Sequence, residues 1–123
     1  MIELTVNHPL FSKARPRVTS RGTFMPKAYK DNQKEMRRQL EEQWGDRPAL
    51  EGPLRLEIEL YGEGRGDIDN MIGAFFDTAN KLLWVDDRVS IITAVSVQWE
   101  KAPKVNSKWV IRIYDDVGQQ TLL

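Results

Sequence analysis

The segment from Asp69 to Leu83 limits the possible folds of this chain more than any other feature. It reads DNMIGAFFDTANKLL, and its eight apolar residues are too many for a helix that faces water on one side. A surface helix normally keeps its apolar residues to one stripe. The pattern therefore predicts a helix over residues 69–83 that is central in the fold or buried at a contact between two chains.

Strands are expected on both sides of this helix. Residues 54–60 (LRLEIEL) alternate apolar and charged side chains, as does a strand with one buried face, and residues 2–6 show a shorter alternation. Residues 89–97 and 108–114 are rich in β-branched and aromatic side chains, which predicts two strands, with an antiparallel pair as the expected arrangement. A further helix over residues 28–44 would place four apolar residues on one stripe and end at Gly45; the four are Tyr29, Met36, Leu40 and Trp44.

The resulting order is β, loop, α, β, α, β, β, which predicts an α+β fold with a small mixed sheet and two main helices. A chain of 123 residues with 41% apolar content suits one domain over residues 1–123, with residues 117–123 as a loosely held tail. The absence of cysteine excludes disulfides, thiolate metal sites and a cysteine nucleophile. Neither a signal peptide nor a membrane-spanning run is visible, so we expect a cytoplasmic protein with no membrane partner.

The charge distribution is uneven although the net charge is zero. Residues 13–38 contain nine basic and two acidic side chains, a net charge of +7, so the remainder of the chain carries −7. Overlapping this region, residues 7–27 include Pro9, Pro16, Gly22 and Pro26, which predict a long basic loop rather than a helix. One interpretation is a surface that binds an anionic partner, and the alternative is a solvated helix face beside a charged loop.

Two pairs of carboxylates flank the apolar helix: Asp67 and Asp69 precede it, and Asp86 and Asp87 follow it. Their roles could be structural, with Asp69 capping the helix, Asp67 near its positive end and the second pair in a turn. Against this, four charges beside such apolar segments would carry a desolvation cost. Hard oxygen ligands without cysteine suit Mg²⁺ or Mn²⁺, and we expect His8 to be a loop residue rather than a ligand.

Such a metal beside a basic surface favours phosphodiester hydrolysis as the leading hypothesis. Spacing alone does not bring the two carboxylate pairs together, because a helix of 15 residues is about 22 Å long.

Two stretches resemble the RusA family of Holliday junction resolvases: GDIDNMIGAFFDTANKLLWVDDRVS (residues 66–90) and KARPRVTSRGTFMPKAYKDN (residues 13–32). The resemblance implies a homodimer that binds four-way DNA junctions and makes paired symmetric nicks with Mg²⁺, or Mn²⁺ as a substitute, without a nucleotide cofactor. It assigns Asp67, Asp69 and Asp87 as catalytic and metal-binding residues, with Asp86 as a further metal-site residue. It also implies one metal site per subunit, so that the chain would fold back after the helix.

Phosphate contacts are expected from the basic segment, through Lys13, Arg15, Arg17, Arg21, Lys27 and Lys30. Phe24 could stack on bases near the crossover or serve as a core anchor for this segment.

One departure from the family pattern is Gly73, which stands where the family has a catalytic lysine four residues after the second aspartate. Another cation could replace it, either from the basic loop or among Arg65, Lys81 and Arg88. Alternatively, the chain is a weakened or inactive protein that binds branched DNA, or, less in keeping with the basic segment, a small Mg²⁺ enzyme acting on other phosphates. Recombination and debranching of phage DNA are both compatible with a bacterial or phage-encoded protein in the cytoplasm.

Overall fold

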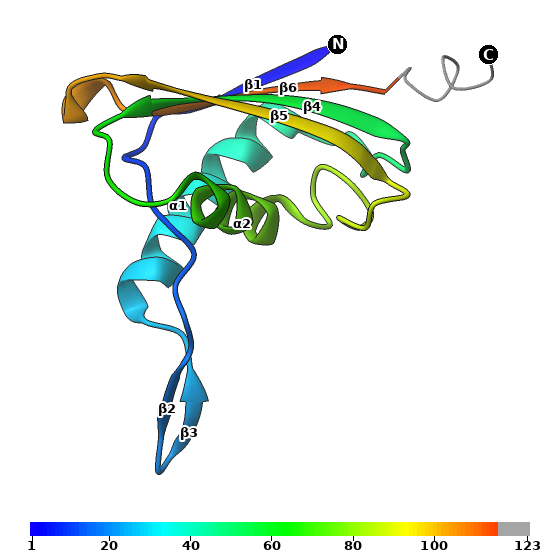
Figure 1. The fold of residues 1–123 in the computed structure, drawn as a ribbon. Coiled ribbons are helices and arrows are strands. Elements are labelled where there is room, and N and C mark those ends of the chain that lie inside the picture. The colour runs from blue at the N-terminus through cyan, green and yellow to red at the C-terminus, as the bar shows by residue number, and fades with distance from the viewer. Residues whose placement is uncertain (116–123) are drawn as a thin grey trace.

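The computed structural model describes residues 1–115, so the tail expected over residues 117–123 lies outside the described residues. It contains two main helices and a mixed four-stranded sheet, which confirms the α+β class (Figure 1). In chain order the elements are β1 (Ile2–Val6), β2 (Arg17–Thr19), β3 (Gly22–Phe24), α1 (Lys27–Trp44), β4 (Leu54–Gly62), α2 (Ile68–Ala79), β5 (Ile92–Lys101), the short 3₁₀ helix η1 (Lys104–Asn106) and β6 (Lys108–Tyr114). Within residues 1–115, no helix is long and apolar enough to cross a membrane.

The strand order in the sheet is β1-β6-β4-β5. The expected antiparallel pairing of the last two strands is wrong: β4 lies between them, parallel to β5 and antiparallel to β6. Parallel neighbours need a crossover connection, and α2 provides it between β4 and β5. The β5 strand begins later than expected because residues 89–91 belong to the turn before it. It also ends later than expected, at Lys101.

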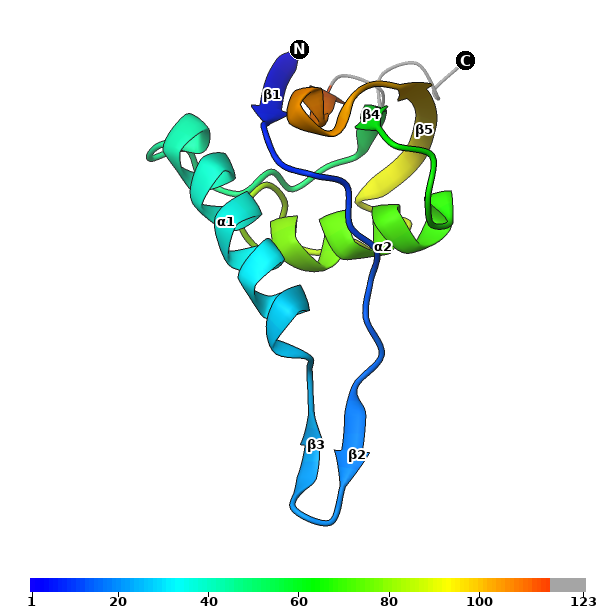
Figure 2. The same ribbon diagram turned by 90° about the vertical axis from the view of Figure 1, so that its left-hand side faces the viewer.

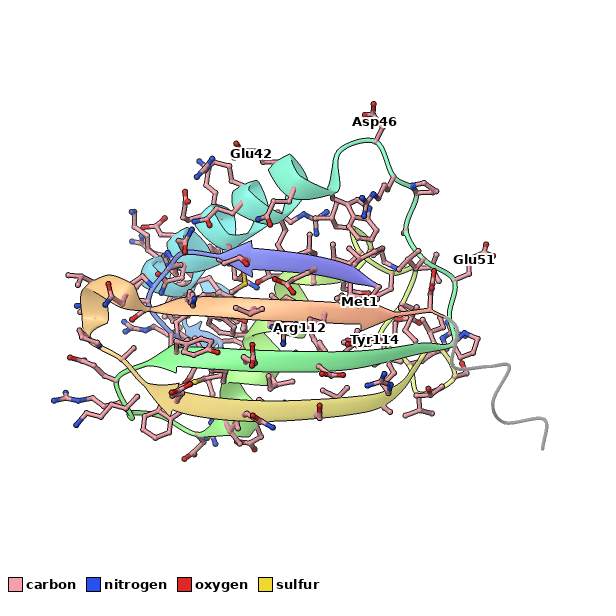
Figure 3. The ribbon with its side chains drawn as sticks, turned by 90° about the horizontal axis from the view of Figure 1, so that it is seen from above. Met1, Glu42, Asp46, Glu51, Arg112 and Tyr114 are labelled. Atoms are coloured by element: carbon pink, nitrogen blue, oxygen red, sulfur yellow. The ribbon has the colours of Figure 1, made fainter. Side chains whose placement is uncertain are left out.

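Both helices cover one face of the sheet (Figure 1). The alternation along β4 works as predicted, since its four apolar side chains from Leu54 to Leu60 are at most 1% exposed. On the open face, the Arg112 guanidinium contacts the carboxylates of Glu3 and Glu59 (Figure 3). The predicted apolar stripe of α1 is confirmed, because all four of its residues are buried.

The α2 helix ends at Ala79, four residues before the predicted end. Lys81 has a positive φ of 71°, which takes the chain out of the helical conformation. The carbonyls at this helix end accept hydrogen bonds from Arg37 of α1, at 2.8 Å to Thr78 and 3.1 Å to Asn80. On the buried side, the Phe75 ring packs against Trp84 and other aromatic rings, so α2 is central in the fold, as predicted.

The segment expected to be a long loop contains a hairpin. Strands β2 and β3 pair antiparallel around a two-residue turn before Gly22, whose φ of +121° favours glycine. All residues of both strands are exposed, and the hairpin projects away from the sheet and helices (Figure 2). The alternative role of Phe24 as a core anchor is wrong, because this side chain is 49% exposed; Phe11 packs on the core instead, against Tyr29 and Trp109.

Candidate active site

Asp67 and Asp69 lie at the N-terminal end of α2. The helix begins two residues earlier than the capping role for Asp69 requires, so Asp67 is the N-cap and Asp69 is in the first turn. The Asp67 side chain makes no capping hydrogen bond, and Asp69 Oδ1 accepts one from the backbone N–H of Asn70 at 2.9 Å. Both residues are exposed beside the positive end of the helix dipole, where carboxylates are stabilised.

Asp86 and Asp87 lie in the loop between α2 and β5. Asp86 accepts a hydrogen bond from the Asp87 backbone N–H, and its other oxygen lies 2.8 Å from the Arg88 guanidinium. The Arg88 hydrogen bond, followed by that of the backbone N–H, holds the pKa of Asp86 below its usual value. Asp87 is exposed and Asp86 is half-buried. In a single chain, three of the four carboxylates are therefore exposed, and burial affects Asp86 alone among them.

Asp67 and Asp69 lie at the beginning of α2, and Asp86 and Asp87 follow its end. The segments before and after α2 lie at opposite ends of this helix (Figure 1). The loop after α2 is hydrogen-bonded to Leu50, and the Leu54 N–H bonds to the Ile91 carbonyl, so this loop lies beside the beginning of β4. Asp67 follows the end of β4 by five residues. Since β4 spans about 26 Å and α2 about 18 Å, the chain does not fold back as expected.

Within residues 1–115, no group of three or more histidine, cysteine, aspartate or glutamate side chains is arranged to hold a metal ion. The donor chemistry suits Mg²⁺, but a single chain offers only two of the predicted carboxylates at either end of α2. The roles assigned to these residues remain predictions.

The segment that leads into the hairpin is joined to α2 next to the first carboxylate pair. The Lys13 backbone N–H donates a hydrogen bond to the Asn70 carbonyl at 2.9 Å. The Lys13 side chain then crosses Gly73, where a Cβ would lie 3.5 Å from the lysine Cδ, and its ammonium lies 3.2 Å from Asp77. A cation of the basic segment therefore lies over the position of the missing family lysine.

Asp77 also contacts α1, the helix that follows the hairpin. The Tyr29 hydroxyl of α1 donates a hydrogen bond to the Asp77 carboxylate at 3.4 Å. Burial, and then the negative charge of Asp77, raise the pKa of Tyr29 to about 12. The sequence alone gave no reason to single out Asp77, since nothing in its spacing relates it to residue 13.

The other predicted cations have different surroundings. Arg15, Arg17 and Arg21 are exposed on the hairpin segment, and Lys30 is exposed on α1. Lys27 pairs with Asp31 at 2.7 Å, an exposed pair.

Among the replacements suggested for the missing lysine, Arg88 is engaged with Asp86 and Lys81 points to the Val85 carbonyl at 3.5 Å. Arg65 is exposed in the glycine turn just before Asp67.

An exposed apolar surface lies beside α2 and β5. Ile68 and Trp99 are 46% and 44% exposed and line the same hollow, and Val95 lies on the same side of β5 as Trp99. Ile72 and Phe76 follow Ile68 at helical spacing and are only partly buried. This apolar flank (Ile68, Ile72, Phe76, Val95 and Trp99) extends along α2 from one carboxylate pair toward the other.

The chain matches a known protein family over most of its length. No individually curated protein matches the chain. The family model of endodeoxyribonuclease RusA matches residues 8–114, which include the hairpin, both helices and all four aspartates. The chain therefore belongs to the RusA endodeoxyribonuclease family.

Proposed function

We propose that this protein is a Mg²⁺-dependent endonuclease that resolves four-way DNA junctions by paired symmetric nicks. Membership of the RusA family supports this function. The observation that carries it furthest is the hydrogen bond between the Lys13 N–H and the Asn70 carbonyl, which fixes the start of the basic segment beside the turn that bears Asp69. A phosphate bound where this segment meets α2 would lie near a carboxylate pair able to take part in hydrolysis. The reaction would take place in the cytoplasm, where the DNA substrate lies.

Two chains would complete each metal site. Asp67 and Asp69 of one chain would meet Asp87 of its partner, supported by Asp86, in an antiparallel two-fold pairing along the apolar flank. Exposed apolar patches of this kind commonly mark protein contacts. The position of the flank between the two carboxylate pairs supports a second copy of this chain as its occupant.

These residues would hold Mg²⁺ through carboxylate oxygens, and the bound ion would supply an acidified water and charge neutralisation at the phosphate. In hydrolysis the oxygen of a water would bond to phosphorus while the bond to the leaving sugar oxygen breaks. The water would release one proton to solvent, and the leaving oxygen would take one up. Arg15, Arg17 and Arg21 would hold the flanking phosphates, so that the scissile bond stays beside the acidic residues.

The first experiment compares a labelled four-way junction with linear duplex of the same sequences, in Mg²⁺, Mn²⁺ or EDTA, and measures binding and scission together. We expect symmetric nicks in the junction alone, abolished by EDTA. Asp69→Asn should remove cleavage and keep junction binding, because the substitution replaces a ligand oxygen without adding bulk. Junction binding without cleavage in either metal would instead favour the alternative function, a protein that binds branched DNA without cutting it.

A subunit-mixing experiment tests whether two chains share a site. Asp69→Asn and Asp87→Asn proteins should each be inactive, and an unfolded and refolded mixture should regain nicking. In a mixed dimer, one site receives Asp69 from one chain and Asp87 from the other, whereas the second site receives neither. Sites formed within one chain would give no recovery, and Asp69→Asn protein mixed with itself is the control.

A further inference from the structure

We infer that the Lys13 ammonium contacts the scissile phosphate during cleavage, and that Asp77 holds this ammonium in the absence of DNA. The inference rests on the proposed function and adds a catalytic residue to it. Lys13 belongs to the basic segment for which only general phosphate contacts were expected, and its position on α2 distinguishes it from the arginines of the hairpin.

The backbone of Lys13 is fixed where such a cation is needed. Its N–H donates a hydrogen bond to the carbonyl of Asn70, the residue after Asp69. Movement of the Lys13 backbone away from α2 would break this hydrogen bond. Arg17 and Arg21, by contrast, belong to the projecting hairpin (Figure 2).

The side chain of Lys13 has room to move. Gly73 leaves the surface of α2 flat below it. Among residues 1–115, Lys13 provides the only atoms within 4 Å of a Cβ built at that glycine, apart from its chain neighbours and the helix backbone. The side chains of Lys13 and Asp77 are 49% and 37% exposed, and an ion pair so open to solvent is weak. A phosphodiester is therefore able to compete with Asp77 for the ammonium.

The distances allow the Lys13 ammonium to leave Asp77 and reach a phosphate beside Asp69. Asp69 and Asp77 are eight residues apart, which is about 12 Å along a helix. The Lys13 backbone is anchored between them, and a lysine side chain reaches about 6 Å from Cα to Nζ. Rotation of the side chain would carry the ammonium from Asp77 toward the turn with Asp69. There it would neutralise charge on a non-bridging phosphate oxygen and keep its own protons.

The test uses the full chain and compares Lys13→Gln with Lys34→Gln, an equal charge change at an exposed position of α1. Single-turnover cleavage at saturating protein should fall about 100-fold in Lys13→Gln, the typical loss for one group that stabilises developing charge. Junction binding in EDTA should weaken far less, about tenfold at most, because Lys13 is one of several expected phosphate contacts. Adding Gly73→Lys to Lys13→Gln should restore most of the rate, because the new side chain starts where the Lys13 chain lies.

A second measurement needs no metal and no activity. The side-chain NMR signal of Lys13 should shift in Asp77→Asn protein, and should shift in wild-type protein when a four-way junction is added in EDTA, while Lys34 stays unchanged. Unaltered cleavage by Lys13→Gln would overturn the inference and leave the proposed function standing. A Lys13 signal that does not shift when the junction is added would do the same. A wild-type protein that binds junctions without cutting them would overturn both.

Discussion

Replacing Gly73 by alanine should stabilise the protein. Glycine within a helix lowers the free energy of unfolding by about 0.5–1 kcal/mol relative to alanine, because glycine has more backbone freedom to lose on folding. At Gly73 the described part of the chain does not offset this difference: there a Cβ would meet Lys13 carbons alone, at 3.5 and 3.9 Å, which are ordinary contacts. We therefore expect the free energy of unfolding to rise by about 0.5–1 kcal/mol, and Tm by about 2–5 °C in a domain of this size.

The measurement is thermal and urea unfolding followed by circular dichroism at one fixed protein concentration, since dimer formation would make Tm depend on concentration. Gly52→Ala is the matched control. Gly52 has a φ of +78°, and a Cβ there would lie 2.7 Å from the Ile91 carbonyl oxygen. This variant should lose more than about 1 kcal/mol. A destabilised Gly73→Ala protein would show that the Lys13 side chain does not lie over an open helix surface.

Three further predictions follow from the core, the hairpin and Asp77. Phe75→Ala should cost about 3–5 kcal/mol in unfolding free energy, because this fully buried ring packs between other aromatic rings; a loss below about 1 kcal/mol would contradict this packing. Arg15→Ala with Arg17→Ala should reduce the slope of log K against log salt for junction binding by about 2, one phosphate contact each, whereas an unchanged slope would remove these arginines from the interface. Since the pKa of Tyr29 is raised from 10.0 to about 12, the stability that its neutral phenol contributes is full below pH 10 and is lost between pH 10 and 12. Tyrosinate absorbance should show this late ionisation, and Asp77→Asn should shift it to lower pH while burial keeps it above the usual value.

Local patterns predicted most elements correctly because they report which face of an element is buried. The alternation from Leu54 to Leu60 and the stripe from Tyr29 to Trp44 both describe surfaces that pack on the core, and both predictions are confirmed. The hairpin was missed, although Thr19-Ser20-Arg21-Gly22 between two short β-prone segments is a turn signal. The prolines around it favoured a loop. Since all residues of both hairpin strands are exposed, no alternation of buried and exposed side chains marks these strands in the sequence.

The sequence by itself determined the α+β class, the central place of α2 and the family to which its motifs point. It could not determine which strand lies beside β4, because pairing depends on the crossover through α2 and not on the composition of either strand. Nor could it show that the chain after α2 does not bring the two carboxylate pairs together, or that Lys13 reaches Asp77 across Gly73. These are contacts between residues distant in the chain, and only the packing of the helices and the sheet brings such residues together.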